Sequence, residues 1–316
     1  MTQTLARIAL CLSLLSPLGA QAQEIIDQFR SVSSDERISI EVLRGEVRIR
    51  TSEDNLFRVR GALDTDATGY SLESAAGRTR FEVEMPRNTR QGNADVGSQL
   101  EIEVPAGSTL EFQGVNVNVD VQGVNGGTAI HTVNGNILAQ DLHSLVALSS
   151  VNGRIDSHNN AGTLELSTIN GELRDSGSSG TVSFSSVNAD IKVDSQAQEV
   201  VISTINGKAS VQLTGTQTLN ISTVNGDVSV RLADSVRPTV NSSTVGGDLR
   251  LSLEPQVNAS FALSSSVGGD IDNRLSEARA VRDRFGPGSS LNFSHGDGSG
   301  SVEASSVNGD IEIDSL

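Results

Sequence analysis

The feature that most constrains this chain is a turn that returns at a fixed interval. Its asparagines recur with one constant step through six copies, at Asn116, Asn134, Asn152, Asn170, Asn188 and Asn206. The series then continues with wider and less regular steps, at Asn225, Gly246, Gly268 and Asn308. Such a period is typical of a repeat protein, in which each unit packs only on its neighbours.

Two all-β architectures could contain such a turn. Asn-Gly between strands is the usual signal of a two-residue hairpin, which would make the chain a meander. In a β-solenoid each unit is one coil, and equivalent positions stack about 4.8 Å apart along the axis. A meander has little reason to keep its turns equally spaced, whereas a solenoid needs equal coils. The period therefore favours an all-β, single-stranded β-solenoid (β-helix-like) with coils of about 18 residues.

The residues around each turn alternate between buried and exposed types. Apolar residues stand six and four positions before the asparagine and three after it, Ser or Thr stands two before, and Val or Ile one before, as between Thr163 and Leu173. This period of two predicts a strand, a corner, a second strand and a second turn in each unit. In-register stacking would align the hydroxyls of Thr168, Ser186, Thr204 and Thr223, which could form a ladder of hydrogen bonds along the axis from coil to coil. It also predicts a structural ladder of turn amides at Asn116, Asn134, Asn152, Asn170, Asn188, Asn206, Asn225 and Asn308.

Five segments are predicted along the chain. Residues 1–22 have the pattern of a signal peptide, with Arg7, an apolar stretch from Ile8 to Leu15 and a small-x-small cleavage site ending at Ala22. Residues 23–112 are predicted to form an irregular β cap with strands at 38–42, 46–50, 81–85 and 100–104, and a polar loop at 88–98. The solenoid repeats follow at 113–272, a helix and Gly-rich insertion at 273–300, and the last coil at 301–316.

The insertion near the C-terminus carries a helical spacing of apolar residues. Leu275, Ala278, Val281 and Phe285 recur at intervals of three and four, and Gly286-Pro287-Gly288 would stop a helix there. We therefore predict a short helix lying on the solenoid.

The signal-like segment predicts an exported protein of the periplasm or the cell surface. Cys11, the one cysteine, lies inside that segment, so the mature chain would have neither disulfides nor thiolate metal ligands. Without Arg7 the chain has 22 basic against 39 acidic residues, a net charge of −17 that repels nucleic acid. No later stretch could span a bilayer as a helix, so we expect no transmembrane segment in the mature chain. We also expect the mature chain to be a monomer.

The residues offer a few candidate chemistries, each with an argument against it. Acidic residues often stand two after the turn asparagine, as at Glu172 and Asp227, and a column of carboxylates could collect Ca²⁺. Arg154 and Lys208 stand in the same column and would expel a cation. Asp190 and Lys192 share a strand face, as in enzymes that cleave acidic polysaccharides, but nothing beside them would form a cleft. We therefore expect no catalytic residues, no metal site and no cofactor.

The serial turns also resemble a known family. Ser/Thr-x-Val-Asn-Gly-Asp-Ile turns, the Gly45 to Ile49 strand, the segment from Leu100 to Gly107 and the closing residues 298–311 are similar to bacterial "putative adhesin" domains of unknown function. The resemblance covers nearly all of the mature chain and implies a β-helix-like fold in the bacterial cell envelope, with adhesion or surface interaction as its role. It supplies no catalytic residues. Ala189, Gly246 and Gly268 depart from the turn motif and would interrupt its polar column.

The leading functional hypothesis is a non-enzymatic envelope or surface module, adhesin-like or scaffold-like, that binds a protein or glycan partner through its repetitive solenoid surface. A second hypothesis is an envelope-stress accessory protein that docks a regulatory protein through the N-terminal region or through Arg279, Arg282 and Arg284. A polysaccharide-active enzyme is the third and least favoured.

Overall fold

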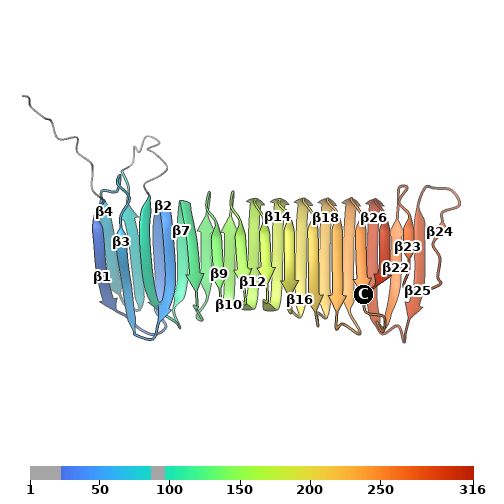
Figure 1. Ribbon diagram of the computed structural model, residues 1–316, viewed down its shortest axis with the longest axis horizontal. Coiled ribbons are helices and arrows are strands. Elements are labelled where there is room, and N and C mark those ends of the chain that lie inside the picture. The colour runs from blue at the N-terminus through green and yellow to red at the C-terminus, as the bar shows by residue number, and fades with distance from the viewer. Residues whose placement is uncertain (1–22, 87–96) are drawn as a thin grey trace, which may run out of the picture.

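The structure is a computed structural model that describes residues 23–86 and 97–316. These residues form 27 strands and no helix. The predicted signal peptide and nearly all of the predicted 88–98 loop lie outside the described residues. Figure 1 shows a long rod in which the strands lie across the axis and follow one another from end to end.

Each regular coil contributes one strand to each of two faces. The first face holds the strands before the Asn-Gly corner, which are β8 (Thr128–Thr132), β10 (His143–Ser150), β12 (Ala161–Asn170), β14 (Ser179–Asn188), β16 (Glu199–Asn206), β18 (Thr218–Asn225) and β20 (Thr239–Gly246). The second face holds the strands after it, which are β9 (Ile137–Gln140), β11 (Ile155–His158), β13 (Leu173–Ser176), β15 (Ile191–Ser195), β17 (Ala209–Thr214), β19 (Val228–Ala233) and β21 (Leu249–Leu253). β7 (Thr109–Gln122) bends around the corner and pairs with both β8 and β9.

Neighbouring coils pair in parallel and in register. Leu166 lies beside Phe184, and Phe184 beside Ile202, so equivalent positions of consecutive coils are direct neighbours. The solenoid prediction is confirmed over the meander, because a meander would pair consecutive strands antiparallel.

The core is a set of columns that run the length of the rod. Side chains at alternate positions point inward, so that Leu164, Leu166 and Leu173 of one coil are at most 1% exposed. Each such side chain contributes about 1.5–3 kcal/mol when fully buried. Because every coil repeats the same inward positions, the core grows in one dimension and needs no large central volume.

The N-terminal end departs from simple chain order. Its strands are β1 (Ile25–Ser31), β2 (Arg37–Ser52), β3 (Leu56–Ala62), β4 (Gly69–Ala75), β5 (Arg78–Glu84) and β6 (Ser98–Pro105). β2 spans both faces, like β7, and lies between β7 on one side and β5 and β6 on the other. β1 pairs antiparallel with β3, β3 with β6, and β4 with β5, and these pairs close this end. The strands predicted at 38–42 and 46–50 fall within β2 and that at 100–104 within β6, whereas the strand predicted at 81–85 extends one residue beyond β5.

The C-terminal end also departs from chain order. Its strands are β22 (Ala259–Ser265), β23 (Ile271–Asn273), β24 (Val281–Arg282), β25 (Ser289–His295), β26 (Gly300–Asn308) and β27 (Ile311–Ser315). β26 lies between β20 and β22, and β27 between β21 and β23. The coil that comes last in sequence is therefore enclosed by two coils that precede it.

The predicted helix between Leu275 and Phe285 is wrong. Residues 275–277 form a bend within an irregular segment, and Val281 pairs antiparallel with Ser290. The side-chain amide of Asn273 donates to Ser276 Oγ at 2.8 Å and to the Ala278 carbonyl at 3.0 Å, which holds the chain in a turn. Val281 and Phe285 are 68% and 93% exposed, so the apolar spacing is not used to bury one helical face. Pairing with β25 outweighs the local helical pattern.

Close approach of the coils leaves no free space for a Cβ at the Gly171 corner. A Cβ added to Gly171 would lie 2.1 Å from the carbonyl oxygen of Gly153 in the neighbouring coil. Glycine stands at this corner position in most coils, whereas Ala189 occupies it in one. Backbone contact between neighbouring coils therefore limits the size of the residue at this corner.

We predict that Gly171→Ala lowers stability by about 2–4 kcal/mol, because the added Cβ must push apart two coils that are fixed by hydrogen bonds. Ala189→Gly is the matched control and should cost at most about 1 kcal/mol through backbone entropy. Thermal unfolding of both variants measures the difference. Equal melting temperatures for Gly171→Ala and the native chain would show that the corner tolerates the methyl group.

One carboxyl group is buried at the second turn. Asp175 is 4% exposed, and its Oδ1 accepts hydrogen bonds from Ser157 Oγ at 2.6 Å and Ser178 Oγ at 2.5 Å. Its Oδ2 has no hydrogen-bond partner among the described residues. Burial raises the pKa of Asp175, and the two serine hydrogen bonds and the nearby His158 offset this only in part. The charged form is thus disfavoured in the folded chain.

We predict that Asp175→Asn stabilises the protein at neutral pH, by on the order of 1 kcal/mol, because it removes a buried charge. Since the folded pKa is raised, the native stability should fall as pH rises from the ordinary aspartate pKa through the folded value, and then level off. Denaturant midpoints between pH 4 and 8 measure this slope, which the variant should lose. Asp194→Asn on the exposed surface is the control. An unchanged slope in Asp175→Asn contradicts the assignment.

Candidate interaction surface

The turn asparagines form a continuous line of side-chain hydrogen bonds. Each Nδ2 donates to the Oδ1 of the preceding coil, from Asn134 to Asn116 at 2.8 Å through to Asn225 to Asn206 at 3.1 Å. The four bonds between them measure 2.8–3.0 Å. Asn308 lies in register with Gly246, so it meets no amide there. The side-chain amides of this line, which we call the amide ladder, therefore donate to and accept from one another along the axis.

The inner hydroxyl column does not form a continuous ladder of its own. Thr132 donates to Ser150 at 3.2 Å, but Thr168 donates to the corner carbonyl of Gly153 at 3.4 Å instead. Further along, the hydroxyls of Thr204 and Thr223 have no hydrogen-bond partner among the described residues. Corner carbonyls compete with the next hydroxyl as acceptors, since Thr132 Oγ1 is 3.2 Å from both the Gly135 carbonyl and the Ser150 hydroxyl, so the predicted hydroxyl ladder is wrong as a general feature.

The acidic residues after the corner act as backbone acceptors. Asp190 Oδ1 accepts the amide of Lys208 at 2.9 Å, and Asp248 Oδ1 accepts that of Asp310 at 3.0 Å. Asn136 fills the same role toward Arg154, also at 2.9 Å. Within residues 23–86 and 97–316, no group of three or more His, Cys, Asp or Glu side chains is placed to hold a metal ion. The acidic column therefore has a structural use in joining coils.

The second face is charged and varied. Glu172 binds Arg174 at 2.6 Å and Lys192 at 2.8 Å, and the Arg174 hydrogen bond is the main cause that lowers the pKa of Glu172. Exposed pairs of this kind contribute up to about 1 kcal/mol each. Lys192, which the sequence paired with Asp190 as a candidate acid–base site, is engaged by Glu172 instead.

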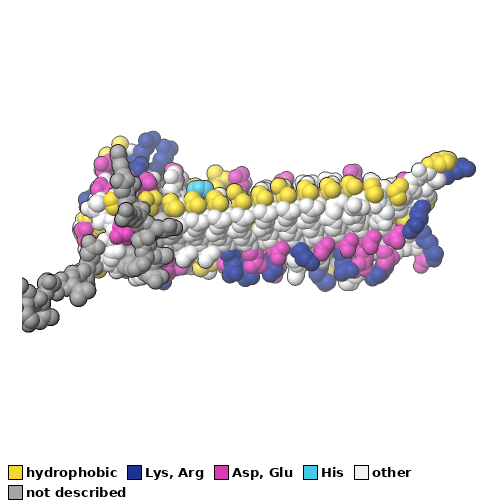
Figure 2. All heavy atoms as spheres, turned by 90° about the horizontal axis from the view of Figure 1, so that it is seen from above, with side chains coloured by type: hydrophobic (Ala, Val, Ile, Leu, Met, Phe, Trp, Pro, Cys, Tyr) yellow, Lys and Arg dark blue, Asp and Glu magenta, His cyan; other side chains and the backbone are white. Residues whose placement is uncertain are grey.

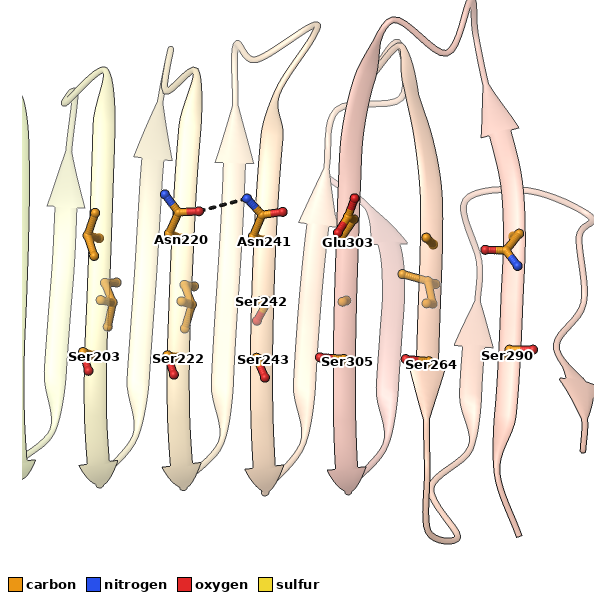
Figure 3. A pocket seen from close by; sticks show the side chains of 17 residues that line it. Ser203, Asn220, Ser222, Asn241, Ser242, Ser243, Ser264, Ser290, Glu303 and Ser305 are labelled. Atoms are coloured by element: carbon orange, nitrogen blue, oxygen red, sulfur yellow. Dashed lines mark hydrogen bonds between the residues drawn. The ribbon is translucent and has the colours of Figure 1, made fainter. Parts of the chain in front are cut away.

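The first face carries an outward line of serines, which we call the serine row. In order along the axis the row is Ser149, Ser167, Ser185, Ser203, Ser222, Ser243, Ser305, Ser264 and Ser290. Among the described residues, none of these hydroxyls has a hydrogen-bond partner. Figure 3 shows Ser203, Ser222, Ser243, Ser305, Ser264 and Ser290 at one height on neighbouring strands.

A shallow hollow of about 730 Å³ lies over the C-terminal half of the serine row. Its far wall includes Asn220 and Asn241, whose amides are joined by a 2.9 Å hydrogen bond, and Glu303, the one charged residue in the lining. The hollow therefore presents hydroxyl and amide groups and almost no charge.

An exposed line of apolar side chains runs along the Asn-Gly corner of the coils, beside the amide ladder, and we call it the apolar ridge. It consists of the residue before each turn position, in axial order Val115, Val133, Val151, Ile169, Val187, Ile205, Val224, Val245, Val307 and Val267. Seven of the ten are 36–50% exposed. Figure 2 shows a row of hydrophobic side chains along the rod, with an uncharged band between this row and the charged side chains on one side of it.

Two of the three arginines proposed as a partner contact share one hollow. Arg279 and Arg282 both line the hollow that contains Asp270 and Asp272, and Arg282 binds Asp270 at 2.6 Å. The Arg284 guanidinium instead lies 5.4 Å from the ring centre of the exposed Phe285. Without the helix, the three side chains stand on a loop segment, on the two-residue strand β24 and on a turn.

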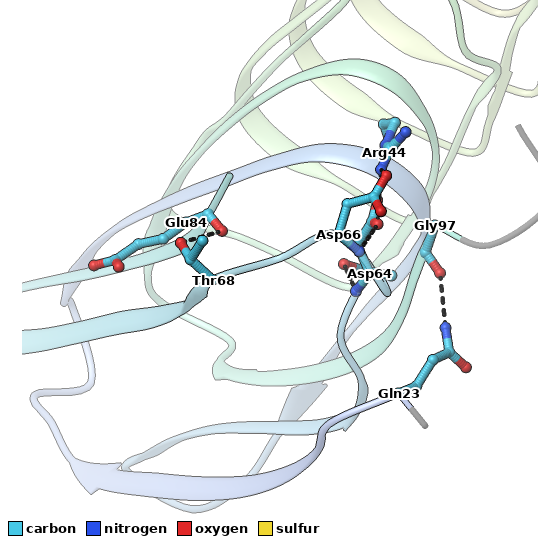
Figure 4. A network of polar contacts seen from close by, with 8 residues as sticks. Gln23, Arg44, Asp64, Asp66, Thr68, Glu84 and Gly97 are labelled. Atoms are coloured by element: carbon cyan, nitrogen blue, oxygen red, sulfur yellow. Dashed lines mark hydrogen bonds and ion pairs between the residues drawn. The ribbon is translucent and has the colours of Figure 1, made fainter. Parts of the chain in front are cut away.

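A buried ion pair at the N-terminal end had no signal in the sequence. Arg44 lies in register with Asn116, at the position where the amide ladder would continue. It turns instead to Asp64, with two hydrogen bonds of 2.7 and 2.8 Å, and to Asp66 at 2.8 Å (Figure 4). Asp64 is 3% exposed. The cap thus ends the ladder through contacts between separate strands and loops, which no local pattern predicts.

These features define a class of protein: a β-solenoid of stacked two-strand coils with a charged face, a serine face and closed ends. The chain belongs to the Toastrack DUF4097 family, whose model matches residues 36–314. The resemblance drawn from the turn motifs is thereby confirmed.

One similar solved structure is described as a "putative cell adhesion protein" from Clostridium sporogenes ATCC 15579. It is 10% identical, with a TM-score of 0.23 over 93% of this chain and 100% of that one. At that TM-score the likeness carries no argument about function. The comparison with curated proteins gives no match. Among the described residues no helix is long and apolar enough to cross a membrane.

We predict that Asn188→Asp destabilises the chain by about 1 kcal/mol. A carboxylate accepts from Asn206 but cannot donate to Asn170, and it places a negative charge against the Asn170 oxygen. Asn125→Asp makes the same charge change at an exposed side chain without a hydrogen-bond partner among the described residues, and should leave the melting temperature unchanged. Equal melts for the two variants would mean that the ladder contributes nothing measurable.

Proposed function

We propose that this protein is a non-catalytic module of the cell envelope or cell surface, which binds a macromolecular partner along the serine row. The observation that carries the proposal is that the serine row repeats although its side chains point outward. Core packing explains repetition at inward positions but places no such demand on exposed ones. A constant row on the outside is expected where the surface itself is used.

The opposite face provides an internal comparison. Its outward positions in successive coils include Asp156, Arg174, Lys192, Ser210 and Ser229, which share neither charge nor size. Both faces belong to the same coils and obey the same spacing, so the solenoid fold alone does not make an outward position uniform. This contrast supports a role for the first face.

The chemistry of the serine row favours a partner that is polar and uncharged where it makes contact. Each hydroxyl can donate and accept a hydrogen bond, and none is committed to another described residue. Single contacts of this kind are weak, but a row of them engages a repetitive or extended partner at many points together, which raises the overall affinity. A protein or a glycan chain with regularly spaced polar groups fits this description.

Two other functions receive less support from the arrangement. Docking of a regulatory protein through Arg279, Arg282 and Arg284 would require three available and converging side chains, but Arg282 is bound to Asp270 and Arg284 lies against Phe285 rather than in the hollow that Arg279 and Arg282 line. Cleavage of acidic polysaccharide would require a basic group in the hollow, whose lining has only the carboxylate of Glu303 as a charged group. We therefore propose binding without turnover.

The test is to place two charges on each face in turn. Ser222→Glu with Ser243→Glu should reduce binding to the native envelope fraction by roughly tenfold, because the new carboxylates must be desolvated or displace the partner. Ser210→Glu with Ser229→Glu makes the same change in net charge on the second face and should bind like the native chain. Co-sedimentation with the envelope fraction measures both. Equal binding by the two double variants would remove the serine row as the site.

A further inference from the structure

The apolar ridge is left without a function by the serine-row proposal, and its exposure needs an explanation. Ten β-branched side chains form one continuous line, while single exposed apolar residues are ordinary on a protein surface. Contiguous apolar surface of this kind marks an interaction site. We infer that the apolar ridge is the contact line for a second copy of this chain, with two solenoids lying side by side and antiparallel, in place of the monomer expected from the sequence.

The spacing of the ridge favours a second copy over other partners. Ridge residues follow the coil repeat of about 4.8 Å. An α-helix laid along the ridge repeats about every 5.4 Å per turn, and an extended strand presents one face every ~6.6 Å, so either falls out of step within a few coils. A second copy of the chain keeps the same repeat from Val115 to Val267 and can interdigitate over the whole length.

The charge pattern permits this approach along the apolar ridge. The chain has a net charge of −16, so two copies repel each other over most of their surface. The ridge is bordered by the serine row on one side and by the amide ladder on the other, and both are neutral. Two ridges can therefore meet without bringing carboxylates together.

The size of this surface approaches that of a specific dimer. The ridge contributes ten residues per copy and the amide ladder beside it seven, against about 20–30 residues a side in standard interfaces, and the serine row stays free for the proposed partner. A two-fold axis makes the contact self-complementary and closes the assembly at two copies.

The order of side chains along the ridge selects the antiparallel arrangement. With the two-fold axis between Val187 and Ile205, each isoleucine meets a valine: Ile205 faces Val187, and Ile169 faces Val224. A parallel pair would set Ile169 against Ile169 and Ile205 against Ile205. Because isoleucine is larger than valine, these pairs would hold the two ridges apart and leave the valine pairs poorly packed. The antiparallel pair spreads the bulk evenly.

Sedimentation of the native chain across micromolar concentrations tests the inference. A dimer is expected, and Ile169→Asp with Ile205→Asp should weaken dimerisation by roughly a hundredfold or more. Leu145→Asp with Val236→Asp alters two equally exposed apolar residues outside the ridge and should leave the dimer intact. A native chain that stays monomeric throughout, or a ridge variant that dimerises like the native chain, overturns the inference.

Disulfide trapping tests the orientation, in a chain where Cys11 is replaced by Ser. Val115→Cys and Val267→Cys lie at opposite ends of the ridge, so antiparallel copies should crosslink when the two variants are mixed and not when either is alone. Crosslinking of Val115→Cys with itself overturns the antiparallel arrangement. Because none of these changes touches the serine row, loss of the dimer with envelope binding retained separates this inference from the proposed function.

Discussion

The structure depends on one constraint, the in-register parallel pairing of each coil with the next. Backbone hydrogen bonds fix the distance between coils, and every other feature has to fit that distance. The corner must accept a neighbouring carbonyl where Gly171 lies, so side chains are excluded there. Asparagine amides come close enough to bond along the axis, and acidic side chains reach the next backbone amide. What is repeated in the sequence is what this one distance requires.

The same pairing explains which parts of the fold could be predicted. The constant step between turn asparagines and the alternation between Thr163 and Leu173 are local patterns, and they led correctly to stacked coils and to the line of turn amides. The apparent helix at Leu275 was wrong because strand pairing with β25 and the side chain of Asn273 decide that segment, and neither is visible in the apolar spacing. Arg44 and Asp64 form their ion pair across the cap, where no repeat exists to relate them.

The surface divides by the same logic into positions that the fold explains and positions that it does not. The amide ladder and the acidic acceptors join coils, so their recurrence from coil to coil is structural. The serine row and the apolar ridge repeat as faithfully but bond to nothing within the described chain. Sequence periodicity alone does not separate these cases, because both kinds of position recur once in every coil. Only the side-chain directions and hydrogen bonds distinguish a row that builds the rod from one that is presented by it.

The enclosed position of β26 and β27 has a consequence for the length of the rod. Residues 300–315 sit between coils that come earlier in the chain, so the distal end is tied into a unit that cannot be extended by adding a coil after it. β2 does the same at the proximal end, between β7 and the strands β5 and β6. Between these two interlocked ends the coils are interchangeable. A coil inserted or deleted there would change the length of the rod by one coil spacing and leave both ends unchanged. The number of middle coils therefore sets the distance between the two ends.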